Sequence, residues 1–230
     1  MNLCILRGAG PVLGFDFREP FPLLEEGSHS YLEAQGHSRL VDAWLGLDTE
    51  RVERLLVKSS EHQLWVGLGA EKLLTPYTEL RLLLSQLELK DGDTIIDLGA
   101  AYGRMGFVLG RHYPEVYFVG YELAKERVEH GNECLKRHGC LRAELRHVDL
   151  SDRHFELSSA TYFFIYDYGS RAAIEKTLQD LLRIAVKQRQ TVRVIGRGRA
   201  SRDAIERGHP WLSQVVAPRH YKHYSIYSSS

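Results

Sequence analysis

Residues 93–123 constrain the fold of this 230-residue chain more than any other stretch. An apolar run leads to Asp97 and then to a turn of small residues, 99–103. A helical stretch follows, and a second apolar run leads to the acid Glu122. Strand–turn–helix–strand units build open parallel sheets, in which ligands bind beyond the carboxyl ends of the strands. The sequence therefore predicts a ligand site formed by this turn and the two acids.

The turn and the second acid favour a nucleoside as the ligand. Glycine and alanine let a ligand approach the backbone closely, and a carboxylate can accept hydrogen bonds from both ribose hydroxyls. The dinucleotide fingerprint needs its glycines at a pyrophosphate. Here the spacing is Gly99-x-Ala101-x-Gly103-x-x-Gly106, and Asp97 leads it. An acid in this place suits a cationic sulfonium or ammonium better than a pyrophosphate.

This loop resembles motif I of the class I S-adenosylmethionine-dependent methyltransferases, an acid followed by alternating small residues. Ala101 stands where the middle glycine is usual. The resemblance implies S-adenosyl-L-methionine as the cofactor, with Asp97 serving its amino-acid part and Glu122 its ribose. The alternative is a βαβ unit of some other α/β protein. The cofactor-binding residues that the resemblance implies are Tyr77, Asp97, Gly99, Ala101, Tyr102, Gly103, Glu122, Leu123, Asp149, Leu150 and Asp167.

Two further acids follow predicted strands where the family has functional groups. The resemblance implies that Asp149 bonds the adenine amino group, with Leu150 beside the ring. Asp167 and Tyr168 would stand at the mouth between cofactor and substrate, and they are the predicted catalytic residues. Each acid has a structural alternative, because an Asp at this position also caps a turn or a helix. For Asp167 that helix is the one predicted to begin near Ser170.

The remaining pattern predicts an α/β fold. The resemblance covers about residues 75–230, the predicted methyltransferase domain, and residues 1–74 are expected to form an N-terminal helical extension or cap. We expect a seven-stranded, mostly parallel, doubly wound sheet with a C-terminal antiparallel hairpin. Besides the unit at 93–123, strands are predicted at 143–148, 161–166, 191–195, 211–216 and 221–227, and helices at 28–47, from 49, 77–87, 124–138 and 171–188. The apolar face expected to pack in the cap is Leu40, Trp44, Leu55 and Leu56.

Charge and composition exclude some classes of function. Lys+Arg and Asp+Glu both number 30, so the formal net charge is zero, which argues against a protein built to coat nucleic acid or an anionic membrane. The basic cluster Arg193–Arg207 leaves nucleic acid as a less favoured partner, and a solvated rim is the alternative. The three cysteines form no metal-like cluster, and His220 and His223 would point to opposite faces of a strand, so no metal site is predicted.

The same features favour a cytoplasmic protein with no membrane partner. Three unclustered cysteines suit a reducing compartment. No apolar run approaches the roughly 20 residues that span a bilayer, and the first residues lack a basic region followed by a long apolar one.

Within the methyltransferases, the run from Thr75 to Gly106 is similar to the protein-lysine group that lacks a SET domain and methylates nucleosomal histone. That likeness implies a loop, with Thr75, Tyr77 and Thr78, near the methionine end of the cofactor. The chain departs from the group in its Ala-Ala-Tyr turn, and it lacks the group's Asn-rich fourth motif and basic extension. The histone substrate is therefore not carried over.

Together these observations predict a methyltransferase that transfers a methyl group to an acceptor of unknown class. A protein side chain or a small molecule is favoured over nucleic acid. Two alternatives stay open: a Rossmann oxidoreductase that uses NAD(P), and a non-catalytic binding protein that retains the cofactor fold.

Overall fold

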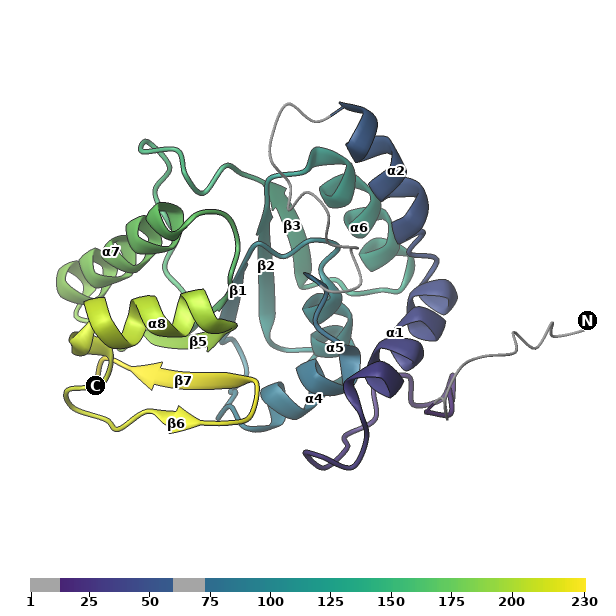
Figure 1. Ribbon diagram of the computed structural model, residues 1–230, viewed down its shortest axis with the longest axis horizontal. Coiled ribbons are helices and arrows are strands. Elements are labelled where there is room, and N and C mark those ends of the chain that lie inside the picture. The colour runs from purple at the N-terminus through teal and green to yellow at the C-terminus, as the bar shows by residue number, and fades with distance from the viewer. Residues whose placement is uncertain (1–12, 60–72) are drawn as a thin grey trace, which may run out of the picture. The chain divides into compact units, whose positions relative to one another are not determined.

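The computed structural model describes residues 13–59 and 73–230 (Figure 1). These residues fall into two compact units: one comprises residues 13–59 and 73–88, and the other residues 89–230. The sequence had placed residues 75–88 with the second unit, and the boundary at 74/75 stays a prediction. No helix in the described part of the chain is long and apolar enough to cross a membrane.

The first unit is helical. Its helices are α1 (Tyr31–Leu45), α2 (Thr49–Ser59) and α4 (Tyr77–Ser85). Helix α1 begins at a capping box, in which the Ser30 hydroxyl accepts from the Glu33 amide and the Glu33 carboxylate accepts from the Ser30 amide. It ends at Gly46, which adopts a left-handed conformation. Helix α4 is bonded to α1, because the Tyr77 amide donates to the Ser38 hydroxyl at 3.2 Å.

The apolar face predicted for this unit is wrong in three of its four residues. Leu40, Trp44 and Leu55 are 43%, 41% and 46% exposed, whereas Leu56 is buried. The buried positions of α1 and α2 are instead Ala34, Val41, Leu45 and Val52. Neighbouring residues lie about 100° apart around a helix, so the predicted ridge of α1 is one position away from the true one.

The second unit is built on one sheet. Its strands are β1 (Thr94–Leu98), β2 (Tyr117–Glu122), β3 (Ala143–His147), β4 (Tyr162–Tyr166), β5 (Arg193–Arg197), β6 (Arg219–His220) and β7 (Tyr224–Ser228). The strands lie in the order β3-β2-β1-β4-β5-β7-β6. All pairs are parallel except those that β7 makes with β5 and β6. The predicted fold class, a mostly parallel seven-stranded sheet with a C-terminal antiparallel hairpin, is confirmed.

Helices cover both faces of this sheet. They are α5 (Arg104–His112), α6 (Lys125–Arg137), α7 (Arg171–Gln188) and α8 (Arg199–Gly208). One face carries α7 and α8, whose Leu178 and Ile205 belong to the same buried cluster as Leu98 and Phe163 of the sheet. The other face carries α5, whose Gly106 lies against Phe118 of β2. In Figure 1, α7 and α8 run side by side above the yellow β6–β7 hairpin.

The C-terminal third differs most from the prediction. Helix α8 was not predicted, because only Ser201, Ala204 and Ile205 give it a buried face. The predicted strand at 211–216 is wrong: Pro210–Leu212 form a short 3-10 helix, η1, and Val215 is 72% exposed. The partner of β7 is instead the two-residue strand β6. The apolar pattern of this stretch is typical of a strand, but Pro210 begins a tight 3-10 turn there.

Candidate functional site

The turn after β1 owes its small residues to its backbone. Gly99, Ala101 and Gly103 have φ angles of 90°, 47° and 73°, so every second residue is left-handed. Glycine adopts this region without penalty, whereas a residue with a Cβ loses roughly 1–2 kcal/mol there. The alternating small residues are therefore a requirement of the turn, and Ala101 is its strained member.

Packing around the turn leaves little space for larger side chains. A Cβ built on Gly99 would lie 2.6 Å from the Cβ of Tyr168. One built on Gly103 would meet the Leu145 side chain at 3.1 Å, and one on Gly106 would meet Phe118 at 2.9 Å. Replacing Gly99 with valine would thus disturb the protein itself, so that substitution does not test contact with a ligand.

Glu122, at the end of β2, is hydrogen-bonded to the turn. One carboxylate oxygen accepts from the Ala101 amide at 2.8 Å, and the other accepts from the Ala124 amide at 2.9 Å. The second oxygen also lies 3.4 Å from Nη1 of Arg127. The residue is only 5% exposed. The oxygen bonded to Ala101 has a further lone pair, whereas the other oxygen accepts from both Ala124 and Arg127, so Glu122 keeps acceptor capacity for a hydroxyl group of a ligand on the Ala101 side.

Asp97 lies on the same face of the sheet as Glu122, because it pairs with Gly120, two residues earlier on β2. Its side chain is buried, with the residue 7% exposed. Within residues 13–59 and 73–230, this carboxyl group makes no hydrogen bond and no ion pair. Burial, and then the negative charge of Glu122, raise the pKa of Asp97 to about 8. A buried carboxyl group without a polar partner is unfavourable unless a ligand completes it.

These two acids define what the site can bind. Below a pH of about 8, Asp97 holds a proton, and a cation placed beside it would displace that proton. A pyrophosphate would instead add negative charge next to two buried acids. The arrangement therefore suits a ligand that brings hydroxyl groups to Glu122 and a positive charge to Asp97.

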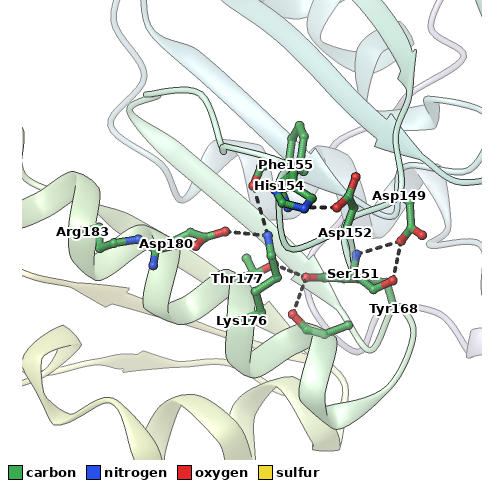
Figure 2. A network of polar contacts seen from close by, with 11 residues as sticks. Asp149, Ser151, Asp152, His154, Phe155, Tyr168, Lys176, Thr177, Asp180 and Arg183 are labelled. Carbon is green, nitrogen blue, oxygen red and sulfur yellow. Dashed lines mark hydrogen bonds and ion pairs between the residues drawn. The ribbon is translucent and has the colours of Figure 1, made fainter.

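Asp149 follows β3 and is exposed. One of its carboxylate oxygens accepts from the amide and the hydroxyl of Ser151, at 2.8 and 2.6 Å (Figure 2). This is the turn-capping contact that the structural alternative expects. Leu150 is buried within the core cluster, and Leu123 is half-buried.

Asp167 follows β4, and its carboxylate binds the first turn of α8. Its carboxylate accepts from the amide and the hydroxyl of Ser201, both at 2.8 Å, and from the Ala200 amide at 3.4 Å. Its backbone is left-handed, with φ of 34°. A Cβ on Gly198 would lie 2.2 Å from the carboxylate, so a glycine is needed there. The helix expected to take this cap, α7, is capped by Ser170 instead.

Tyr168 is bound to α7. Its hydroxyl contacts the Thr177 hydroxyl and donates to the Ala173 carbonyl at 3.3 Å. Burial raises the pKa of Tyr168 to about 12. The phenol is therefore a neutral group held against a helix, with its Cβ over the Gly99 turn.

Two tyrosines of the predicted site are fully buried. Tyr77 belongs to the first unit and donates to the Asp42 carboxylate at 2.8 Å. The ring of Tyr102 lies edge-on to His130 of α6, with centroids 6.4 Å apart. Arg197 of β5 was placed by the sequence only in the basic cluster at 193–207, whereas it is 5% exposed with its guanidinium 4.0 Å above the Tyr166 ring. The sequence did not reveal that Arg197 pairs with Tyr166, the last residue of β4, because β5 was predicted to end at residue 195.

No protein-family model matches the chain, and no curated protein matches it. Among solved structures, an RNA methyltransferase from Salinibacter ruber in complex with S-adenosyl-L-homocysteine is similar over 67% of this chain and 91% of that chain, at 19% identity and a TM-score of 0.47. A precorrin-6y C5,15-methyltransferase from Geobacter metallireducens GS-15 is similar over 70% and 90%, at 16% identity and a TM-score of 0.49. TrmN from Thermus thermophilus is similar over 67% and 48%, at 16% identity and a TM-score of 0.47.

The C-terminal strands β6 and β7 form an antiparallel pair in an otherwise parallel sheet, as the family resemblance implies. The chain has the fold of the class I methyltransferases. This chain spans about half the length of the TrmN chain. At these identities and TM-scores the likenesses carry no argument about function, which is inferred from the chain's own residues.

Proposed function

We propose that this protein binds S-adenosyl-L-methionine and transfers its methyl group to an acceptor. The observation that carries the proposal is Asp97, a buried carboxyl group that has no polar partner in the described residues and stands at the carboxyl end of β1. The ammonium group of the cofactor's methionine part would supply the missing positive charge. Glu122, two residues beyond the strand partner of Asp97, would accept from the ribose.

The residues around these acids have separate tasks. The backbone of Gly99–Gly103 would lie against the cofactor, and Asp149 would accept from the adenine amino group. S-adenosyl-L-methionine supplies a methyl group on a cationic sulfur, and that group passes to a nucleophilic atom of the acceptor. The chain contributes by binding, by aligning the two reactants and by keeping water out. A general base is needed only when the acceptor must lose a proton.

Asp167 and Tyr168 therefore need not exchange protons to be part of the site. We propose that both shape the mouth beside the cofactor. The Asp167 carboxylate is bonded to the first turn of α8, and the phenol of Tyr168 keeps its proton at neutral pH because burial raises its pKa to about 12. Their contribution is to hold the segment after β4 in a fixed position against the Gly99 turn.

We propose a protein side chain or a small molecule as the acceptor, ahead of nucleic acid. The net charge is zero. Part of the basic cluster at 193–207 is engaged internally, since Arg199 and Arg207 both pair with Asp203, at 3.7 and 3.9 Å. Arg202 donates to the Gly198 carbonyl, and Arg193 stacks on Tyr162. These contacts favour the interpretation that the cluster is a solvated rim rather than a surface that binds nucleic acid.

The test is titration calorimetry of the full chain with S-adenosyl-L-methionine, S-adenosyl-L-homocysteine and NAD. We expect micromolar binding of the first two, about −8 kcal/mol, and no measurable binding of NAD. Tight binding of NAD alone would replace the proposal with the oxidoreductase alternative. Binding of the first two without methyl transfer to any protein, small-molecule or nucleic-acid pool would favour the non-catalytic alternative.

A further inference from the structure

The segment 149–158 connects β3 to β4 through two successive turns. The Asp152 amide donates to the Asp149 carbonyl at 3.1 Å, and the Phe155 amide donates to the Asp152 carbonyl at 3.1 Å. The Asp152 carboxylate accepts in addition from the His154 amide at 2.9 Å. Because each turn begins where the previous one ends, the position of Phe155 is linked to the position of Asp149.

Phe155 is held from two sides. Its ring lies edge-on to Tyr121 of β2, with centroids 5.3 Å apart. Its carbonyl accepts a hydrogen bond from Nζ of Lys176 at 3.2 Å, and the same ammonium lies 5.6 Å from the ring centroid. Figure 2 shows Lys176 reaching from α7 to this segment. The segment is thereby tied both to the sheet and to a helix.

Lys176 is itself fixed on α7. Its Nζ donates to Asp180, one turn further along the helix, at 2.9 Å, and Asp180 also contacts Arg183. The Lys176 side chain is 20% exposed and that of Asp180 is 6% exposed. Two of the three ammonium donors are thus committed in one geometry. A shorter or uncharged side chain cannot satisfy both the carboxylate and the Phe155 carbonyl.

We propose that Lys176 is a positioning residue for base recognition. By holding Phe155, it sets where Asp149 stands, and Asp149 then distinguishes adenine from other bases. The proposal rests on the proposed function, because it assigns Asp149 to the adenine amino group. A site built to accept a hydrogen bond discriminates strongly against an analogue that lacks the donor, but only while the acceptor is held in place.

The test compares S-adenosyl-L-homocysteine with its analogue in which hypoxanthine replaces adenine, because hypoxanthine presents an acceptor where adenine presents a donor. Wild-type protein should prefer the adenine compound by about 100-fold. In Lys176→Met the affinity for the adenine compound should fall about tenfold, and the preference for adenine should fall to below about tenfold. Lys187→Met, an exposed lysine of the same helix, is the matched control and should keep the wild-type preference.

Amide hydrogen exchange over residues 150–158 in the ligand-free protein gives a readout that does not depend on the cofactor, and it should speed up in Lys176→Met but not in Lys187→Met. An unchanged preference for adenine in a folded Lys176→Met protein would overturn the proposal. If that variant does not fold, Lys176→Gln, which keeps a hydrogen-bond donor group on a shorter and uncharged side chain, should show the same changes at smaller size. Failure of wild-type protein to bind the adenine compound at all would instead contradict the proposed function.

Discussion

Asp97 and Asp167 stand at the ends of adjacent strands, β1 and β4, yet the protein uses them differently. The carboxylate of Asp167 accepts three hydrogen bonds from residues 200 and 201, and its charge faces the positive end of α8. The carboxyl group of Asp97 makes no hydrogen bond among the described residues and carries a raised pKa of about 8. One acid is satisfied by the fold, and we propose that a ligand completes the other.

The difference shows that an acid at a strand end is an ambiguous signal by itself. Both residues follow apolar runs, and the sequence predicts site roles for both. What separates them is whether a helix N-terminus, which supplies unpaired amides, lies within reach. Helix α8 reaches Asp167, whereas α5 begins at Arg104, beyond the turn from Asp97.

The largest expected effect is on ligand affinity. Asp97→Asn removes the charge that would pair with the cofactor's ammonium, so binding of S-adenosyl-L-homocysteine should weaken by about 2–4 kcal/mol. The matched change Asp167→Asn keeps an acceptor for α8 and should alter affinity less than about threefold. Calorimetry on both variants makes the comparison, and equal losses in the two would show that the contrast between the acids is not functional.

The pH dependence of stability sharpens the comparison further. The folded-state pKa of Asp97 is raised, so its contribution to stability is fully present below about pH 4 and is lost as the pH rises through about 8. The free energy of unfolding of wild-type protein, measured against Asp97→Asn, should therefore fall by roughly 2 kcal/mol between pH 6 and pH 8. Urea unfolding at several pH values measures this, and parallel curves for the two proteins would contradict the pKa assignment.

Asp167 should matter for stability more than for binding. Asp167→Ala removes the cap of α8 and should lower the free energy of unfolding by about 1–2 kcal/mol. Asp167→Gly loses the same cap but suits the left-handed backbone, with φ of 34°, so it should be less destabilising than alanine by up to about 1 kcal/mol. A lower free energy of unfolding for Asp167→Gly than for Asp167→Ala would refute backbone strain at this position.

The smallest expected effect concerns the turn. Ala101→Gly relieves a left-handed alanine, although glycine gains entropy in the unfolded chain, so stability should rise by at most about 1 kcal/mol. Gly103→Ala is the opposite change, at φ of 73° and against Leu145, and it should be destabilising. Thermal unfolding of the pair checks this, and a loss of stability in Ala101→Gly would argue against strain in the turn.

The sequence was informative where pattern and burial coincide. Helix α7 was predicted with its observed limits, because Ser170 caps it and its apolar residues recur at helical spacing. The unit from β1 to β2 was also predicted, with strand ends later by two residues. Helix α8 was missed because only two apolar residues, Ala204 and Ile205, lie on its buried face. The strand at 211–216 was wrongly predicted from an apolar run in which Val215 and Val216 are exposed.

The acids of the site could be found from the sequence, but their partners could not. The local sequence around Asp167 does not reveal that residues 200 and 201 donate to its carboxylate, because more than thirty residues separate them. In the same way, Tyr77 of α4 donates to Asp42 of α1, a residue 35 positions earlier in the chain. Such contacts decide whether a polar side chain is satisfied by the fold, and they require the tertiary structure.

The proposed function requires that Asp97 is protonated in the ligand-free protein and that a cationic ligand displaces the proton. Calorimetry at pH 7 in buffers of different ionisation enthalpy counts the protons released when S-adenosyl-L-homocysteine binds. With a pKa of about 8 for Asp97, wild-type protein should release close to one proton, about 0.9, and Asp97→Asn should release close to none. Tight binding to wild-type protein with no proton release would contradict the account.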